Sequence, residues 1–245
     1  MKLREKILRV FYPRRCCVCD KIILSDGPLC EGCRAGAFHF PYPSPTCPIC
    51  GLPEEKCGCG VWRYYEKAVF PLPYTGDARK ALHEMKFRGR TDKIKPLAAE
   101  IVRAVREREM TSGIDLVTFV PMAKSSEYRR GYNQAEELAK AVAKSLGLPC
   151  RALLYKYADT ETQHEQSFIR RQGNILGAYE PVEEEIEGFN GKGVLVVDDI
   201  LTSGATLNEA AKTLLIFGAQ RVFVAAAAGR PREKKKKATQ DSEKA

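Results

Sequence analysis

The spacing of apolar residues alternates between helical and strand-like periods from about residue 75 onward. The helical period predicts helices over residues 77–87, 96–108, 134–146 and 206–217. Short apolar runs predict strands over residues 115–120, 193–197 and 221–227, and the last two read as fully buried. Strands that alternate with helices indicate an α/β fold, in which helices flank a mostly parallel sheet.

The first quarter of the chain follows neither period. Nine of the ten cysteines lie between Cys16 and Cys59, in segments rich in proline and glycine. That composition suits turns around a metal ion better than regular helices. An aromatic, strand-like stretch over residues 62–74 then marks the seam between modules. We therefore expect a cysteine-rich zinc-binding module over residues 1–62, an α/β domain over residues 63–230 and a disordered basic tail over residues 231–245.

Eight of these cysteines form four closely spaced pairs, namely Cys16 and Cys19, Cys30 and Cys33, Cys47 and Cys50, and Cys57 and Cys59. A C-x-x-C turn brings two thiolates to one side, so two such turns complete a four-sulfur zinc site. Sequential pairing predicts one site from the first two pairs and a second site from the last two. The second site is less regular, because a single residue separates Cys57 from Cys59, and Cys17 remains as a spare thiol.

Two other uses of paired cysteines stay open. A disulfide framework needs oxidising conditions, and the N-terminal residues show no secretion signal. An iron–sulfur cluster also takes four thiolates, although paired turns with this spacing suit zinc better. Four protein thiolates leave no open coordination position, so we expect the one or two zinc ions to be structural.

The segment GVLVVDDILTSGATL, residues 193–207, carries the most informative pattern. A buried strand leads into Asp198 and Asp199, and a small polar loop then precedes a helix. Backbone N–H groups and hydroxyls at a helix N-terminus favour a phosphate. Two carboxylates at the carboxyl end of a strand suit ribose hydroxyls or a magnesium-bound sugar diphosphate. We therefore predict a ribose-phosphate site whose loop consists of Thr202, Ser203, Gly204, Ala205 and Thr206.

The alternative is a strand–turn–helix whose acids only cap the helix. Capping needs a single acid or hydroxyl, whereas this loop has two acids followed by three hydroxyl residues. The loop also departs from the G-x-x-x-x-G-K-[ST] and G-x-G-x-x-G patterns. Neither a P-loop nor a dinucleotide site is therefore supported.

Residues 194–206 resemble the thirteen-residue signature of type I phosphoribosyltransferases. The stretch RGYNQ, residues 130–134, resembles an element of the ComF family of competence proteins. So do His83 with residues 86–89, and a run that contains Gln166, Arg171, Asn174 and residues 177–179. That family also opens with paired cysteine knuckles. The resemblance implies a type I phosphoribosyltransferase fold over residues 63–230, behind an N-terminal module similar to a zinc ribbon.

The same resemblance implies roles for individual residues. It assigns the 5-phosphate to residues 202–206, and the ribose hydroxyls to Asp198 and Asp199 as the catalytic pair. The ligand would be phosphoribosyl diphosphate or a related nucleotide, together with Mg²⁺. The diphosphate turn, residues 120–124, and the arginines near it would contribute Pro121, Met122, Ala123, Lys124, Arg129 and Arg130. Ser125 and Ser126 stand where related sequences often carry basic residues, and ordinary solvation explains Arg129 and Arg130 equally well.

Three functions are compatible with this resemblance. The first is a ComF-like protein that binds the ribose 5-phosphate moiety and acts in DNA uptake during natural transformation, on single-stranded DNA or nucleotides. Its partners would include single-stranded DNA and the DNA-uptake machinery. The second is an enzyme of nucleotide metabolism that transfers a pentosyl group to an acceptor that the residues do not identify. The third is a regulator that binds phosphoribosyl diphosphate without turnover.

Charge and hydropathy narrow the cellular setting. The net charge of +9 comes from residues 1–15, at +5, and residues 230–245, at +4, so that residues 16–229 are neutral. Basic arms can contact nucleic acid, although a solvated tail explains the C-terminal one as well. No apolar run approaches the roughly 18 residues of a membrane span, and no signal peptide is recognisable. We therefore expect a cytoplasmic protein without membrane insertion.

Overall fold

The computed structural model describes residues 13–24, 26–40, 46–47, 49–50, 52–53, 63–156 and 178–230. Its centre is a parallel sheet, in which each strand lies beside the next in the order β1 (Lys67–Val69), β7 (Arg221–Gly229), β6 (Gly193–Leu201) and β3 (Leu116–Phe119). A short strand, β2 (Leu72–Pro73), also pairs with β7. This confirms the predicted α/β fold with a mostly parallel sheet.

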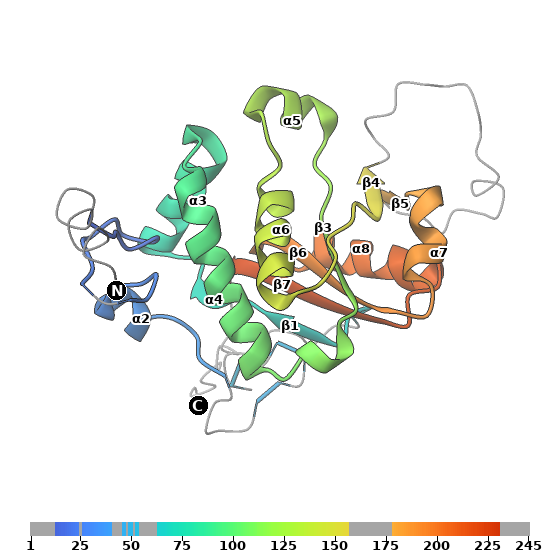
Figure 1. Ribbon diagram of the computed structural model, residues 1–245, viewed down its shortest axis with the longest axis horizontal. Coiled ribbons are helices and arrows are strands. Elements are labelled where there is room, and N and C mark those ends of the chain that lie inside the picture. Colours follow the sequence, from blue (N-terminus) through green and yellow to red (C-terminus); the bar gives the residue numbers. More distant parts are fainter. Residues whose placement is uncertain are drawn as a thin grey trace, which may run out of the picture.

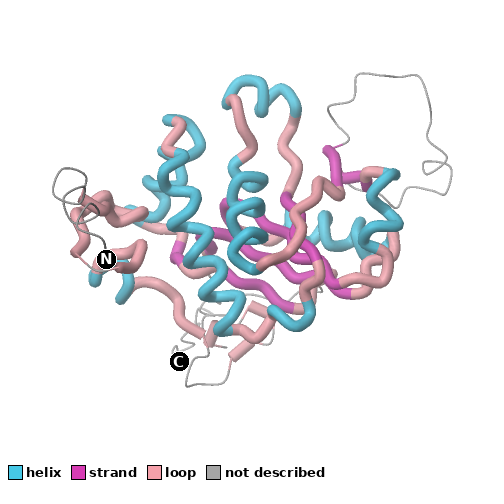
Figure 2. Tube along the Cα trace, in the orientation of Figure 1, coloured by secondary structure: helices cyan, strands magenta, loops and turns pink. Residues whose placement is uncertain are grey.

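Helices cover both faces of the sheet (Figures 1 and 2). One face packs against α3 (Gly76–Arg88), α4 (Ile94–Glu107) and α6 (Gln134–Leu146), and the other against α7 (Ile186–Phe189) and α8 (Ala205–Ile216). Successive side chains of a strand point to opposite faces. Leu195 and Val197 of β6 therefore enter the first core, and Val194 and Val196 the second. Both faces of β6 are apolar for that reason.

The predicted helices correspond to α3, α4, α6 and α8, and α6 has the predicted bounds. The expected strand over residues 193–197 is too short, because β6 continues to Leu201. The neighbouring strand supplies the reason. Strand β7 runs on beside it, with Ile200 opposite Ala228 and Leu201 opposite Gly229. Asp198 and Asp199, the sixth and seventh of the nine residues of β6, consequently lie inside a hydrogen-bonded strand and not after its end.

Several short elements have no counterpart in the apolar pattern. Helix α5 (Lys124–Arg130) follows β3, and an antiparallel pair joins β4 (Leu154–Lys156) to β5 (Tyr179–Pro181). Short 3₁₀ helices in the described residues include Thr91–Lys93, Thr111–Gly113 and Glu183–Glu185. None of the helices in the described part of the chain is both long and apolar enough to cross a membrane.

The N-terminal residues pack against the same two cores. Cys16 and Cys17 are buried with α3 and α4, whereas Cys47 and Cys50 belong to the core beneath α8. Short helix α2 (Glu31–Ala35) lies beside α4, where Arg34 forms a two-pronged ion pair with the buried Glu100 at 2.8 and 2.9 Å. The cysteine-rich module is therefore attached to the α/β domain through apolar burial and charged contacts together.

Candidate functional site

The sheet opens at its carboxyl end into a cavity of about 420 Å³. Segments that lie far apart in the sequence meet around it, from α3 to the first turn of α8. Its wall consists of Tyr74, Lys86, Val120, Pro121, Met122, Ala123, Ser126, Arg130, Asn133, Gln134, Ala135, Lys156, Tyr179, Asp198, Asp199, Ile200, Thr202 and Thr206. Both predicted acids and most of the predicted turn are thus brought together.

The two adjacent acids of β6 interact closely. The backbone N–H of Asp199 donates to Oδ1 of Asp198 at 2.8 Å. Burial raises the pKa of the Asp198 carboxyl well above its ordinary value, the negative charge of Asp199 raises it further, and the ammonium group of Lys86 opposes both effects. A positively charged ligand group or a metal ion would stabilise the ionised form of this pair.

The predicted phosphate loop contributes only its ends to the cavity wall. Thr202 and Thr206 line the cavity, whereas Ser203, Gly204 and Ala205 are not among the lining residues. Gly204 has a left-handed conformation, with φ of 75°, immediately before α8 begins, and the Ser203 hydroxyl accepts from the N–H of Ala205 at 3.3 Å. The loop therefore turns sharply into the helix, so that the first turn of α8 faces the cavity.

Residues that follow the cysteine-rich segment support this loop from behind. The Arg63 guanidinium donates to the Ser203 carbonyl at 3.2 Å, and the N–H of Tyr64 donates to Oδ1 of Asn208 at 2.8 Å. A Cβ atom at position 204 would lie 3.2 Å from the Tyr65 hydroxyl. The sequence gives no local signal for these contacts, because about 140 residues separate the two segments.

The predicted diphosphate turn is partly a helix. Pro121, Met122 and Ala123 line the cavity, but Lys124 is already the first residue of α5. Arg129 is exposed on α5 and does not line the cavity. Arg130 does line it, and its guanidinium lies 5.3 Å from the centre of the Phe87 ring.

Two residues of the RGYNQ element close the wall beneath the turn. Asn133 caps α6, since its Oδ1 accepts from the N–H of Ala135 at 3.0 Å. Its Nδ2 donates to the carbonyl of Val120 at 3.2 Å, which ties the turn to the helix. Gln134 follows and is also buried. Neither residue was among the predicted site residues, although both stood in a segment whose resemblance could have indicated them.

The opposite wall was not predicted at all. Lys156 and Tyr179 face the cavity from the hydrogen-bonded pair of β4 and β5, where they stand opposite each other. Burial raises the pKa of Tyr179 to about 12, with smaller effects from the charges of Asp198 and Glu209. No sequence spacing links these residues to the loop, because strand pairing alone places them there.

Charges on the wall divide into two groups. Among the described lining residues, Lys86, Arg130 and Lys156 are cationic, and Asp198 and Asp199 are anionic. The three cations come from α3, α5 and β4, whereas both acids come from β6. Such a cavity can bind a ligand that has several anionic groups and also presents hydroxyls or a cation to the acids.

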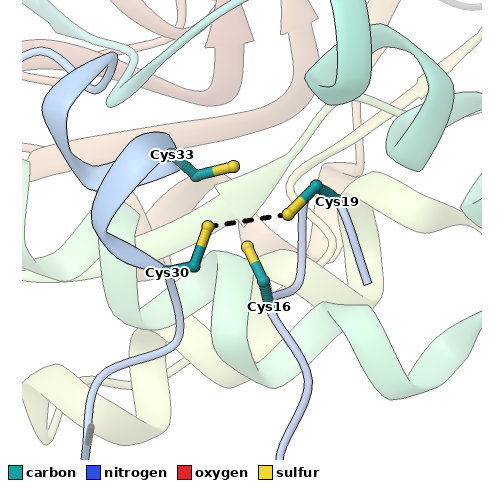
Figure 3. Close-up of side chains that lie close together, drawn as sticks. All are labelled: Cys16, Cys19, Cys30 and Cys33. Atoms are coloured by element: carbon teal, nitrogen blue, oxygen red, sulfur yellow. Dashed lines mark hydrogen bonds between the residues drawn. The ribbon is translucent and has the colours of Figure 1, made fainter. Parts of the chain in front are cut away.

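A second candidate site lies in the N-terminal module. The thiols of Cys16, Cys19, Cys30 and Cys33 all lie within 4.8 Å of one another, and they point toward a common centre (Figure 3). The sulfurs of Cys19 and Cys30 are 3.6 Å apart. The Cys33 backbone N–H is the largest influence on the Cys30 thiol and lowers its pKa to about 7. Four converging sulfurs from two C-x-x-C turns fit a structural zinc ion.

The second predicted zinc site is only partly described. Cys47 and Cys50 are buried in their own turn, whose backbone closes with the N–H of Cys47 donating to the Leu52 carbonyl at 2.9 Å. Cys57 and Cys59 lie outside the described residues, as do the basic tail and the run from Gln166 to Asn174. Cys150, the one cysteine beyond the cysteine-rich segment, is half-buried against the core.

Comparison with known proteins identifies the family to which the chain with this cavity belongs. The chain belongs to the Phosphoribosyl transferase domain family, which matches residues 93–243, more than half of its length. The Double zinc ribbon domain family matches residues 7–62, which supports a structural zinc at the clustered cysteines.

Its relatives are proteins of the ComF type. Competence protein F of Haemophilus influenzae is 28% identical over 87% of this chain and 96% of its own length. DNA utilization protein YhgH of Salmonella typhimurium is 28% identical over 86% of this chain and 95% of its own. A solved structure of the allosteric regulatory enzyme of purine biosynthesis is 19% identical, with a TM-score of 0.40, over 69% of this chain and 32% of that one. The predicted resemblance to ComF proteins is confirmed.

Replacing one cluster thiol tests the zinc centre. Cys30→Ser should lower the zinc content by one ion per chain, because a hydroxyl is a poor ligand for Zn²⁺ in a four-sulfur site. Elemental analysis after purification without added metal measures this. Cys150→Ser is the matched control and should leave the zinc content unchanged. Less than one zinc per wild-type chain would contradict the assignment.

The raised pKa of Asp198 predicts a dependence of stability on pH. The folded protein holds this proton more tightly than the unfolded chain, so stability falls as pH rises from about 4 through the folded pKa. Asp198→Asn should remove this loss and raise the unfolding free energy at pH 7 by about 1.4 kcal/mol per unit of pKa difference. Urea unfolding between pH 4 and 8 measures it, with the exposed Asp77→Asn as control. An unchanged pH profile in Asp198→Asn would refute the prediction.

Proposed function

We propose that this chain binds phosphoribosyl diphosphate, or a nucleotide with the same ribose 5-phosphate, in the cavity at the carboxyl end of β3 and β6. The observation that carries the proposal is the convergence of three parts on one cavity. These parts are the acids of β6, the first turn of α8 and the turn between β3 and α5. Each binds a different part of the ligand.

The 5-phosphate binds at the start of α8. Backbone N–H groups of the first turn and the helix dipole favour an anion there, and Thr202 and Thr206 line the cavity beside them. Ser203, Gly204 and Ala205 contribute through the backbone of the loop. The support from Arg63 and Tyr64 holds this backbone in place before the ligand arrives.

The ribose lies over β6, where Asp198 and Asp199 accept hydrogen bonds from its hydroxyls. Two neighbouring carboxylates also suit Mg²⁺, which proteins commonly hold through one or two carboxylates together with substrate phosphates. When bound, Mg²⁺ would neutralise part of the charge of the diphosphate. The acids themselves orient the sugar and stabilise positive charge that develops on it.

The diphosphate lies between the turn and the cationic side chains. Pro121, Met122 and Ala123 present backbone to it, and Arg130 lies at the end of α5. Ser125 and Ser126 bring no charge to this region. Lys86 on α3 and Lys156 on β4 supply positive charge together with Arg130 on α5. Three separate elements thus provide the charge that related sequences often carry in the segment after the turn.

These contacts support transfer of the pentosyl group. The bond between C1 of the ribose and the diphosphate oxygen breaks, and diphosphate leaves with the bonding electron pair. A lone pair of the acceptor forms the new bond to C1, and the acceptor loses a proton to solvent. Lys86, Arg130 and Lys156 stabilise the leaving charge, and the cavity holds the reactants in position. The acceptor itself is not identified by any residue of the cavity.

We further propose that the protein acts in the cytoplasm on nucleotides or single-stranded DNA during DNA uptake. Relatives with the names competence protein and DNA utilization protein support this role. A surface beside the cavity supports it independently. We call it the α3–α5 surface, and its exposed side chains are Arg79, Lys80, His83, Phe87, Arg88, Tyr128 and Arg129.

The α3–α5 surface combines aromatic rings with positive charge. Phe87 is 56% exposed and Tyr128 is 95% exposed, although both are large rings that usually seek burial. Lys86 and Arg130, which line the cavity, also lie within 6 Å of the Phe87 ring centre. A hollow of about 290 Å³ on the same helix is lined by Gly76, Arg79, Lys80, His83, Glu84 and Arg88. Exposed rings that stack on bases, among cations that track the backbone, suit single-stranded nucleic acid.

Calorimetry with phosphoribosyl diphosphate and Mg²⁺ tests the cavity. The wild type should bind. The single variants Asp199→Asn and Lys156→Gln should each weaken binding about tenfold or more, because each removes a charged contact. Lys144→Gln on the exposed side of α6 is the matched control. Release of diphosphate with candidate bases separates an enzyme from a regulator that binds without turnover. Absence of any binding by the wild type would overturn the proposal.

A nucleic-acid titration tests the α3–α5 surface. Replacing Phe87 and Tyr128 together by alanine should weaken binding to single-stranded DNA by about tenfold or more, since stacking contributes about 1–3 kcal/mol per base. Fluorescence anisotropy with a labelled oligonucleotide at several salt concentrations measures this, with the exposed Ile216→Ala on α8 as control. Binding that is absent, or that does not fall with salt, would count against this role.

A further inference from the structure

Lys93 is the most deeply buried charged side chain in the described part of the molecule. It ends the 3₁₀ helix Thr91–Lys93, is only 1% exposed and does not line the cavity. A buried ammonium group is costly unless oppositely charged or polar partners surround it. Its partners therefore indicate what the residue does.

Two of these partners belong to the cysteine-rich module. The ammonium group of Lys93 donates to the Cys17 carbonyl at 3.3 Å and to the Asp20 carboxylate at 3.0 Å. Both residues are part of the turn that carries Cys16 and Cys19, which closes with the Asp20 N–H donating to the Cys16 carbonyl at 3.0 Å. Asp20 has φ of 59°, a conformation that few non-glycine residues adopt. Lys93 thus contacts the turn that supplies half of the four-thiol cluster.

The third partner lies on α3. The carboxylate of Glu84 is 3.7 Å from the Lys93 ammonium group and 3.8 Å from the Arg90 guanidinium. Arg90 also donates to Asp20 at 3.0 Å, so that two cations join Asp20 to Glu84. Ion pairs therefore connect α3, at Glu84, to the cysteine turn, at Asp20.

The same stretch of α3 reaches the proposed ligand cavity. Lys86 stands two residues after Glu84 and lines the cavity wall. The carbonyl of Met85, between them, accepts a hydrogen bond from the hydroxyl of Tyr132 in the RGYNQ element. A continuous set of contacts thus leads from the thiol cluster through Lys93 and Glu84 to the cavity.

We propose that Lys93 is a positioning residue that couples zinc binding at Cys16, Cys19, Cys30 and Cys33 to the conformation of α3 and the ligand cavity. The zinc ion holds the first cysteine turn, and the turn presents Cys17 and Asp20 to Lys93. Without the ion the turn relaxes, Lys93 loses two partners, and the segment from Glu84 to Lys86 shifts away from the cavity.

Coupling of this kind has a thermodynamic consequence. If zinc raises the affinity for the cavity ligand by some factor, the ligand must raise the affinity for zinc by the same factor. The effect of zinc on ligand affinity rests on the proposed function, whereas the effect of zinc on the conformation of α3 does not. A purely structural role for Lys93 would lower overall stability without linking the two sites.

Hydrogen exchange of the α3 amides, measured by mass spectrometry on the full chain, tests the coupling without a ligand. Mild chelation of the wild type should speed exchange around residues 84–88 about tenfold or more, while α8 remains protected. Lys93→Met keeps the length of the side chain and removes its charge. In this variant the zinc-loaded protein should already exchange fast at α3, with its zinc content unchanged, and chelation should add little. Lys95→Met, which is exposed on α4, should behave as the wild type does.

The affinity for phosphoribosyl diphosphate is the second measurement. In the wild type and in Lys95→Met, zinc should tighten binding about fivefold or more. In Lys93→Met this dependence should disappear. If chelation unfolds the chain, a zinc titration with and without the ligand gives the same factor. The coupling would be overturned if zinc removal left the hydrogen exchange of α3 unchanged in the wild type. It would also be overturned if ligand affinity still depended on zinc in Lys93→Met. A wild type that binds no ligand but shows coupled exchange overturns only the proposed function.

Discussion

Strand β6 is hydrogen-bonded to β3 on one side and to β7 on the other, and apolar side chains are buried on both of its faces. A strand paired on both sides cannot slip without breaking its hydrogen bonds to both neighbours, which would leave buried backbone groups unpaired. Asp198 and Asp199, near the end of β6, are consequently fixed in space. The first turn of α8 follows within a few residues, so its position is fixed as well. Every other part of the cavity is arranged around this strand end.

Placing two acids on a buried strand has an electrostatic cost. The raised pKa of Asp198 records it, since burial and the charge of Asp199 both disfavour the ionised form. The ammonium group of Lys86 lowers the pKa of Asp198 and so offsets this cost only in part. Strong pKa perturbation by burial and a like charge is found most often at functional sites.

The N-terminal module is joined to this site through more than its zinc. Its first turn shares a core with α3 and α4, and its second turn shares the core beneath α8. The ion pair between the half-buried Arg34 and the buried Glu100 adds a specific orientation. Four thiols that lie within 4.8 Å of one another repel as thiolates, so the module depends on a metal ion to keep this arrangement. Within the described residues the module and the α/β domain therefore share both apolar cores.

The alternation of strands and helices, the first cysteine cluster and the acids before the α8 loop could all be predicted, because they follow from neighbours along the chain. Local spacing also predicted α6 with its observed bounds. Tertiary structure alone decided the length of β6, which depends on β7 beside it, and the wall of Lys156 and Tyr179, which depends on strand pairing. It also decided the role of Lys93, whose partners lie more than 70 residues away in the cysteine turn. Short-range patterns encode elements and loops, whereas contacts between distant segments arise only when burial brings those elements together.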